Sequence, residues 1–192
     1  MAQDRITEPV RAVVVGGSAG SIEVLIRLLP LLPPSLSFAL LLVLHRKNTA
    51  DSTLAQLLAH KTRLPLREVD DKDPVRPGTI YLAPADYHLL IEQDETFSLD
   101  DSEKVHYSRP SIDVTFESVA DVYGPAAVGV LLSGANADGT AGLRAIQQAG
   151  GRIVAQQPAT AQAAFMPQQA IEHLAVDAVL DIDALADYLK RL

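Results

Sequence analysis

The feature that most constrains this chain is a unit that occurs twice near its start: an apolar run, a polar turn and a helical pattern. Residues 12–15 form the first run, which the glycine-rich turn 16–21 and an amphipathic helical pattern follow. Residues 38–44 form the second run, which is continuous enough for a strand buried on both faces. A helix with a capped start at 48–51 comes next, and this alternation indicates a parallel sheet.

The rest of the chain continues the alternation after an interruption. Between residues 66 and 101 the pattern changes to short alternating segments, 79–83 and 88–91 among them, with Asp-Pro and Pro-Gly turns between. These segments predict short strands and a hairpin insert. The later elements expected are strands at 127–132, 152–155 and 178–180, and helices around 116–122, at 140–149, at 168–174 and from 183 onward.

Together these elements predict one α/β domain. Its sheet is expected to be doubly wound and mostly parallel, flanked by helices, with a short antiparallel hairpin insert. We expect the domain to span residues 12–192, after an N-terminal extension at 1–11, because a chain of 192 residues has the usual size of a single domain.

Composition excludes several classes of protein. The chain has no cysteine, which excludes disulfide scaffolds and cysteine nucleophiles and is typical of a reducing compartment. A net charge of -8 with scattered basic residues argues against a nucleic-acid partner. The most apolar stretch, 28–44, contains Pro30, Pro33 and Pro34, so we expect no membrane insertion and predict a cytoplasmic protein.

Three polar residues follow predicted strands: Ser18, His45 and Asp138. Ligand sites of open parallel sheets lie beyond the carboxyl ends of the strands. A hydroxyl, an imidazole and a carboxylate at that edge are the nucleophile, base and orienting group of a serine hydrolase. Ser18 lies in the segment 16–20, which fits the G-x-S-x-G pattern of a nucleophile turn. The order Ser, His, Asp differs from the Ser, Asp, His order of α/β-hydrolases, so that family is not indicated.

Each of these residues also has a structural alternative. Ser18 can cap the helix that follows it or belong to an anion-binding loop, His45 can be a structural histidine, and Asp138 can cap the helix 140–149. On this alternative the chain is an anion- or nucleotide-binding α/β domain. The lack of both a G-x-G-x-x-G motif and a Walker lysine argues against that class.

Several sequence blocks occur in an order that is typical of one family. They are Gly-Gly-Ser-Ala-Gly at 16–20, His45 after its strand, Pro-Gly through His at 77–88, Arg-Pro-Ser-Ile-Asp at 109–113, Leu-Leu-Ser-Gly through Asp-Gly at 131–139, and Ala-Gln through Met-Pro at 155–167. With these blocks the chain resembles the catalytic domain of CheB-type chemotaxis protein-glutamate methylesterases. A typical member also carries a receiver domain, whereas only residues 1–11 precede the first predicted strand here.

The resemblance implies a serine esterase that hydrolyses glutamate γ-methyl esters on chemotaxis-type receptors, with glutamine deamidation as a related activity. It implies that Ser18 attacks the γ-carbonyl, that His45 moves the proton to methanol, and that Asp138 orients and stabilises the imidazolium. The backbone N–H groups of Ala19 and Ala135 are the expected donors to the oxyanion.

The resemblance also implies partners. These are the methylated cytoplasmic domains of chemotaxis-type receptors and, without a receiver domain, a separate regulatory protein. It implies no cofactor. We expect no metal site, because the other histidines do not form a ligand pattern with nearby acidic residues in the sequence; they are His60, His88, His106 and His173.

The chain departs from the family pattern in three loops around the expected site. It has Ala19-Gly20-Ser21 where the family has Thr-Gly-Gly, Arg46-Lys47 where it has Met-Pro, and Gly134-Ala135-Asn136 where it has Gly-Met-Gly. A catalytically altered member that acts as a signalling or interaction module is therefore an alternative. Retention of the serine, histidine and aspartate favours an active esterase.

Overall fold

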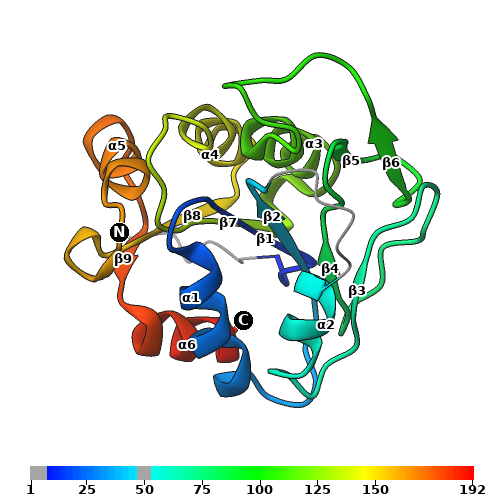
Figure 1. Ribbon diagram of the computed structural model, residues 1–192, viewed down its shortest axis with the longest axis horizontal. Helices are drawn as coiled ribbons and strands as arrows, with labels where there is room; N and C mark the ends of the chain where they lie inside the picture. The colour runs from blue at the N-terminus through cyan, green and yellow to red at the C-terminus, as the bar shows by residue number, and fades with distance from the viewer. Residues whose placement is uncertain (1–7, 47–52) are drawn as a thin grey trace.

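Seven parallel strands form the central sheet in the computed structural model of this protein, which describes residues 8–46 and 53–192 (Figure 1). Their order across the sheet is β3-β4-β2-β1-β7-β8-β9. The chain starts at the centre, moves outward to β3 and later to β9, so the sheet is doubly wound as predicted. The strands are β1 (Ala12–Gly17), β2 (Ala39–Leu44), β3 (Leu66–Glu68), β4 (Ile80–Leu82), β7 (Ala127–Leu131), β8 (Arg152–Gln156) and β9 (Ala178–Leu180).

The central strands are buried on both faces and feed two apolar cores. Along β1, Val13 and Val15 belong to one core, while Ala12 and Val14 belong to the other. This follows from the period of two in a strand, which sends successive side chains to opposite faces. A continuous apolar run is therefore what a strand at the centre of this sheet requires.

Two layers of helices cover these cores (Figure 1). One layer contains α1 (Ser21–Leu28), α2 (Thr53–Ala59) and α6 (Ile182–Lys190). The other contains α3 (Ile112–Tyr123), α4 (Thr140–Gln148) and α5 (Phe165–His173). Short 3₁₀ turns occur at Leu29–Leu31, Gly124–Ala126 and Pro158–Thr160.

The predicted hairpin insert consists of β5 (His88–Ile91) and β6 (Phe97–Asp100), which pair antiparallel. The hairpin docks on α3: the Thr115 hydroxyl donates to the carbonyl of Leu89 at 2.7 Å, and the N–H of Ile91 donates to the Ser118 hydroxyl at 3.1 Å. The loop that leads from β6 to α3 is therefore fixed at both of its ends.

Of two helix starts expected from the sequence, one lies earlier than predicted and the other falls outside the described residues. The helix predicted at 168–174 begins earlier, at Phe165, because Pro167 lies in its first turn, where a missing N–H costs nothing. The predicted helix start at 48–51 lies outside the described residues, and α2 begins within them at Thr53.

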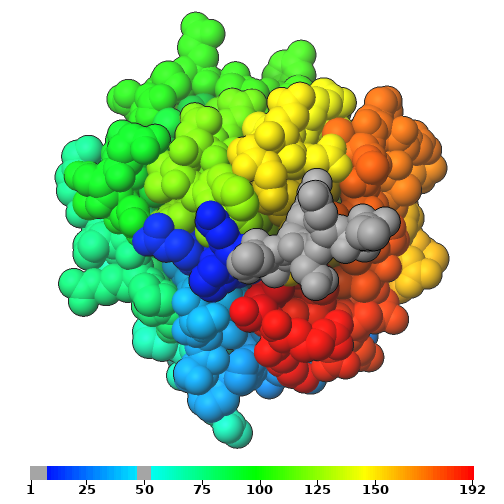
Figure 2. All heavy atoms as spheres, turned by 180° about the vertical axis from the view of Figure 1, so that it is seen from behind, coloured from blue at the N-terminus to red at the C-terminus, as the bar shows by residue number. Residues whose placement is uncertain are grey.

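The sheet reverses its winding direction between β1 and β7, which lie side by side with Gly16 opposite Leu131. Such a reversal leaves a crevice beyond the carboxyl ends of the strands. The residues just before β1 (dark blue) lie on the rear of the molecule, between α3 and α4 (green to yellow) and α6 (red), so β1 enters the sheet from this side and its carboxyl end faces the other way (Figure 2). None of the helices in the described ranges is long and apolar enough to cross a membrane.

Candidate active site

Ser18 and His45 leave neighbouring strands at the same level of the sheet. Gly17 at the end of β1 pairs in register with Leu44 at the end of β2, and the N–H of His45 donates to the carbonyl of Gly17 at 3.1 Å. Adjacent strands lie about 5 Å apart. The backbones of Ser18 and His45 are therefore neighbours, although no hydrogen bond joins their side chains within the part of the chain that the structure describes.

The turn that carries Ser18 is fixed by the loop after β7. The N–H of Ser18 donates to the carbonyl of Ser133 at 2.8 Å. A side chain at Gly134 would meet Met166 and lie 3.0 Å from Cβ of Ser18, so glycine is needed for the two loops to pack this closely. The N-cap of α1 is Gly20, at φ +82°, and not Ser18. Ser18 is thus not used as the cap of its own helix.

His45 and Asp138 form the central contact of the site. Nε2 of His45 lies 2.6 Å from Oδ2 of Asp138. The His45 side chain is 9% exposed and that of Asp138 is fully buried. The N-cap of α4 is Gly139, so the Asp138 carboxylate does not cap the helix that follows it. Its oxygens are free to serve the histidine and the opposite helix.

Three donors at the start of α3 hold the Asp138 carboxylate. Oδ1 accepts from the Ser111 hydroxyl at 3.0 Å and from the N–H of Asp113 at 2.9 Å, and Oδ2 accepts from the N–H of Ile112 at 2.7 Å. Burial by itself raises the pKa of Asp138, but the hydrogen bonds from His45, Asp113 and Ile112 outweigh it and hold the pKa below its ordinary value. The carboxylate is therefore charged and fixed in orientation.

Asn136 faces the other nitrogen of the His45 ring. Its Oδ1 accepts the N–H of Asp138 at 3.1 Å, which directs its Nδ2 toward Nδ1 of His45 at 3.3 Å. Because the Asn136 amide donates, Nδ1 of His45 is the acceptor nitrogen, and Nε2 carries the hydrogen that is donated to Asp138. This tautomer leaves Nδ1 as the nitrogen that can take up a proton.

Ala19 and Ala135 lie on the two loops that meet at Ser18. Both are exposed, and within the described ranges neither backbone N–H donates to another residue. The carbonyl of Ala19, in contrast, accepts the Ser133 hydroxyl at 2.6 Å, which ties the two loops together. The N–H groups expected to receive an oxyanion are thus available to a ligand.

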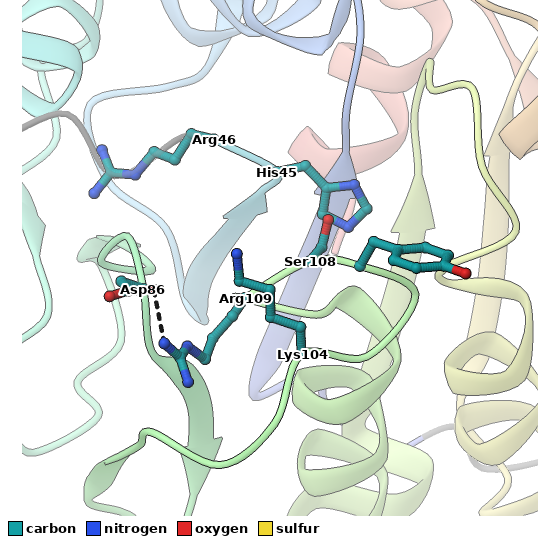
Figure 3. Close-up of a pocket in the computed structure, with 7 residues that line it drawn as sticks. His45, Arg46, Asp86, Lys104, Ser108 and Arg109 are labelled. Atoms are coloured by element: carbon teal, nitrogen blue, oxygen red, sulfur yellow. Dashed lines mark hydrogen bonds and ion pairs between the residues drawn. The ribbon is translucent and has the colours of Figure 1, made fainter.

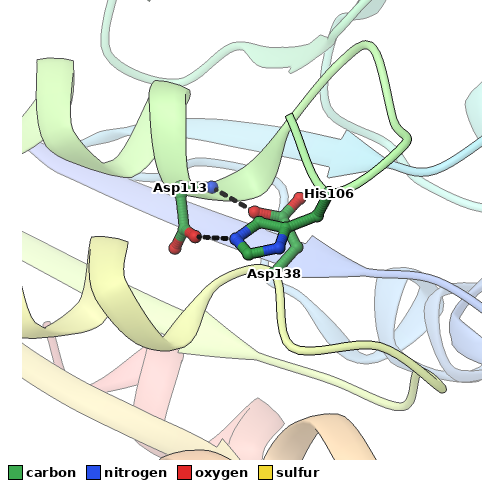
Figure 4. A group of neighbouring side chains, drawn as sticks. All are labelled: His106, Asp113 and Asp138. Atoms are coloured by element: carbon green, nitrogen blue, oxygen red, sulfur yellow. Dashed lines mark hydrogen bonds and ion pairs between the residues drawn. The ribbon is translucent and has the colours of Figure 1, made fainter. Parts of the chain in front are cut away.

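The start of α4 holds Asp113 in the way that the start of α3 holds Asp138. Oδ1 of Asp113 accepts the N–H groups of Gly139 at 2.9 Å and Gly142 at 2.6 Å, and Oδ2 lies 3.2 Å from Nε2 of His106 (Figure 4). Burial raises the pKa of Asp113 to about 6; the hydrogen bond from Gly142 opposes this, and the charge of Asp138 adds to it.

His106, Asp113 and Asp138 together offer three potential metal-ligand atoms within 4.8 Å of one another. The sequence did not predict this group around His106, because Asp138 belongs to a distant loop. Protein donors already contact each carboxylate: four meet Asp138, and three, His106 among them, meet Asp113. The group therefore functions as a hydrogen-bond network behind His45.

Sequence reasoning named Ser18, His45 and Asp138 but missed the residues that hold them. The segment 109–113 was selected for its resemblance alone, although Ser111 is also the N-cap of α3. A serine followed by a helical pattern was the available signal for that cap. Its contact with Asp138 depends on the packing of α3 against α4, which no local pattern encodes.

The fold and the site define a class: an α/β enzyme that carries the parts of a serine hydrolase at the carboxyl edge of a parallel sheet. Comparison with known proteins specifies the family. A family model described as CheB methylesterase matches residues 13–189. The chain therefore belongs to the CheB methylesterase family and is a hydrolase of the CheB type.

Individual relatives agree with this assignment. A protein of Leptospira interrogans is 41% identical over 181 residues, which cover 94% of each chain. The protein-glutamate methylesterase/protein-glutamine glutaminase of Symbiobacterium thermophilum is 36% identical over 95% of this chain and 51% of its own length. The crystal structure of the Thermotoga maritima CheB methylesterase catalytic domain superposes with a TM-score of 0.91 at 30% identity, covering 95% of this chain and 98% of that one.

Proposed function

We propose that this chain hydrolyses glutamate γ-methyl esters in proteins through Ser18, His45 and Asp138. Ser18 Oγ attacks the γ-carbonyl while Nδ1 of His45 takes the serine proton. The tetrahedral intermediate collapses and the bond from the γ-carbon to the methoxy oxygen breaks. His45 gives the proton to this oxygen, which leaves as methanol, and the acyl bond to Ser18 remains. Water then attacks the acyl-enzyme by the same route, which releases the glutamate and restores the serine.

The single observation that carries this proposal is the 2.6 Å contact between Nε2 of His45 and the buried, charged Asp138. A carboxylate in this position stabilises the imidazolium that forms when the serine is deprotonated. Because it occupies Nε2, proton transfer from Ser18 uses Nδ1, and the amide of Asn136 must first give up its hydrogen bond to that nitrogen. The N–H groups of Ala19 and Ala135, which donate to no residue that the structure describes, are the candidates to bind the oxyanion.

The substrates that we propose are methylated cytoplasmic domains of chemotaxis-type receptors, so the enzyme acts in the cytoplasm. The support is family membership and the name that relatives such as the Symbiobacterium thermophilum protein carry. That name also includes a glutaminase activity, and we propose that the same residues deamidate glutamine side chains. In that reaction His45 protonates the departing amide nitrogen, which leaves as ammonia in place of methanol.

A serine-directed fluorophosphonate probe and methanol release from methylated receptor test the proposal. The Ser18→Ala variant is expected to lose labelling and to release methanol at least about 10³-fold more slowly than the unmodified chain. The matched control is Ser98→Ala, whose hydroxyl lies on the surface of β6 and bonds to Glu92, and it is expected to keep both signals.

Labelling that persists in Ser18→Ala would place the nucleophile elsewhere. A chain that is neither labelled nor active would be a catalytically altered family member. Thermal stabilisation of the unlabelled chain by a nucleotide would instead favour the anion-binding alternative.

A further inference from the structure

A pocket of about 400 Å³ opens beside His45 (Figure 3). His45 and Arg46 after β2 form one wall, Asp86 in the turn after β4 forms another, and Lys104 and Arg109 come from the loop between β6 and α3. Ser18 does not line the pocket. The pocket therefore adjoins the reacting centre through His45 and extends away from Ser18.

The charge of this pocket is opposite to that of the whole chain. Among the residues that the structure describes, its lining contains three cations and one carboxylate, whereas the chain has a net charge of -8. Arg46 already donates to Glu68 at 2.5 Å and Arg109 to Asp86 at 2.8 Å. The ammonium of Lys104, in contrast, has no hydrogen bond or ion pair to any residue that the structure describes. Lys104 is thus the cation available to a ligand.

The backbone around Lys104 is anchored on both sides. Arg109 donates to the carbonyls of residues 101–102 at 2.6 and 2.8 Å. Val105 and Ser108 exchange two backbone hydrogen bonds at 3.1 and 2.9 Å. Figure 3 shows the Lys104 side chain directed from this loop into the middle of the pocket. The loop therefore fixes the backbone from which the Lys104 side chain reaches into the pocket.

The turn next to Lys104 is held in a conformation that ordinary residues rarely adopt. His106 has φ 49° and Tyr107 has φ 62°, a region that costs free energy for residues with a side chain. The contact of His106 with Asp113 at 3.2 Å offsets part of this cost. The turn leaves the Tyr107 side chain 98% exposed at the rim of the pocket, where a bound protein segment would cover it.

Two buried donors of the pocket walls also lack an acceptor. Nε of Arg46 and Nε of Arg109 are both buried without a hydrogen-bond partner among the described residues. Buried donors are nearly always paired in folded proteins. These two atoms are too buried for a ligand to reach, so the free charge of the pocket is the Lys104 ammonium, which favours a ligand that brings negatively charged acceptor oxygens.

We propose that this pocket is a second substrate subsite that binds a carboxylate side chain of the protein substrate, with Lys104 as its principal cation. The inference rests on the proposed function. The group that reacts is a neutral ester or amide, and the carboxylate product forms at Ser18, which is outside the pocket. The anion in the subsite is therefore a different residue, an aspartate or glutamate close to the reacting side chain.

Paired peptides test this subsite in the full chain. Each peptide carries one glutamate γ-methyl ester and, at one position within four residues of it, either Asp or Glu or the matching Asn or Gln. For at least one position, kcat/KM for methanol release at low salt is expected to be about 5-fold higher for the acidic peptide. In Lys104→Ala this ratio is expected to fall to about one, and in Lys104→Glu to fall below one.

Lys190→Ala is the control, because Lys190 lies on α6, pairs with Asp187 and does not line the pocket; its ratio is expected to match the unmodified chain. A second readout, the affinity of the Ser18→Ala variant for the same peptides, does not need turnover. If methanol release fails but Lys104-dependent preference in binding persists, the subsite stands and the proposed function falls. If no acidic peptide is preferred, or if the preference survives Lys104→Ala, the subsite is overturned.

Discussion

The two sides of His45 are built in opposite ways. On the inner side Asp138 is fully buried, and donors from His45 and from the start of α3 fill both of its oxygens. On the outer side the pocket is open, and the exposed Lys104 has no partner within the described ranges. The comparison indicates that the fold sets the geometry of the base in advance, whereas the substrate supplies the missing partners for recognition.

The same contrast separates the energetic consequences of substitutions on the two sides. Removing an inner group leaves buried donors unpaired, which costs about 1–3 kcal/mol for each neutral group. Removing an outer cation forfeits only a solvent-screened interaction of about 1 kcal/mol or less. Inner substitutions are therefore expected to change both rate and stability in this CheB-family methylesterase, and outer substitutions to change substrate preference.

The largest expected effect comes from replacing the buried Asp138 carboxylate on the inner side of His45. Asp138→Asn replaces one acceptor oxygen with an NH₂ group. Whichever way the amide turns, this donor faces another donor, either His45 or the groups at the start of α3. We expect kcat for methanol release to fall by about 10³–10⁴-fold. Steady-state kinetics and urea unfolding measure the two consequences separately.

The matched control is Asp181→Asn, because Asp181 also accepts a helix N–H, from Ala184 at 2.8 Å, but contacts no histidine. It is expected to leave kcat unchanged. A kcat for Asp138→Asn within 10-fold of the unmodified chain would show that the inner side is not needed for catalysis.

A smaller effect concerns the pH dependence of stability and arises at Asp113. Its pKa in the folded chain is about 6, above the ordinary value of 3.8 for an aspartate. The protonated group therefore stabilises the fold below pH 3.8, and this stability is lost as the pH rises through about 6. Relative to Asp113→Asn, the free energy of unfolding of the unmodified chain is expected to fall by up to about 3 kcal/mol between pH 4 and pH 7.

Urea unfolding at several pH values checks this sign. Asp121→Asn, an exposed position on the same helix, is the comparison that should follow the unmodified chain. If the difference between the unmodified chain and Asp113→Asn is flat or rises with pH, Asp113 does not titrate in this window.

The smallest expected effect is at Asn136, which lies between the two sides and contacts Nδ1 of His45. In Asn136→Gly the amide no longer occupies Nδ1 of His45, so Ser18 does not have to displace it. We expect kcat to rise by about 2- to 5-fold, the value of one modest hydrogen bond. Unfolding midpoints should accompany the kinetics, since the loop also loses the bond from the N–H of Asp138. A fall in kcat at unchanged stability would instead mean that Asn136 positions the ring for catalysis.

Much of the fold was predictable because local patterns carried it. The apolar run of β2 had to be a strand buried on both faces, and the glycine-rich turn after β1 had to lead into a helix. The helix expected around residues 168–174 begins earlier, at Phe165, with Pro167 in its first turn, a position where proline is tolerated. Such errors arise because proline is found both outside helices and in their first turn.

The site was predictable only in part, and for a physical reason. Ser18, His45 and Asp138 each follow a strand, and parallel strands bring their carboxyl ends to one edge, so topology alone made them neighbours. The Ser111 hydroxyl, the Asn136 amide and the Lys104 pocket depend on side-chain directions and on loops packed against each other. No periodicity or spacing in the sequence encodes those contacts.

Asp138 precedes α4 yet binds the first N–H groups of α3, while Asp113 in α3 binds the first N–H groups of α4. The two helices are therefore clasped at their amino ends by an exchange of carboxylates. Any shift of one helix along the other would displace the Asp138 carboxylate and with it the partner of His45. The hydrogen bonds that join the two helices are thus the same ones that orient the catalytic carboxylate.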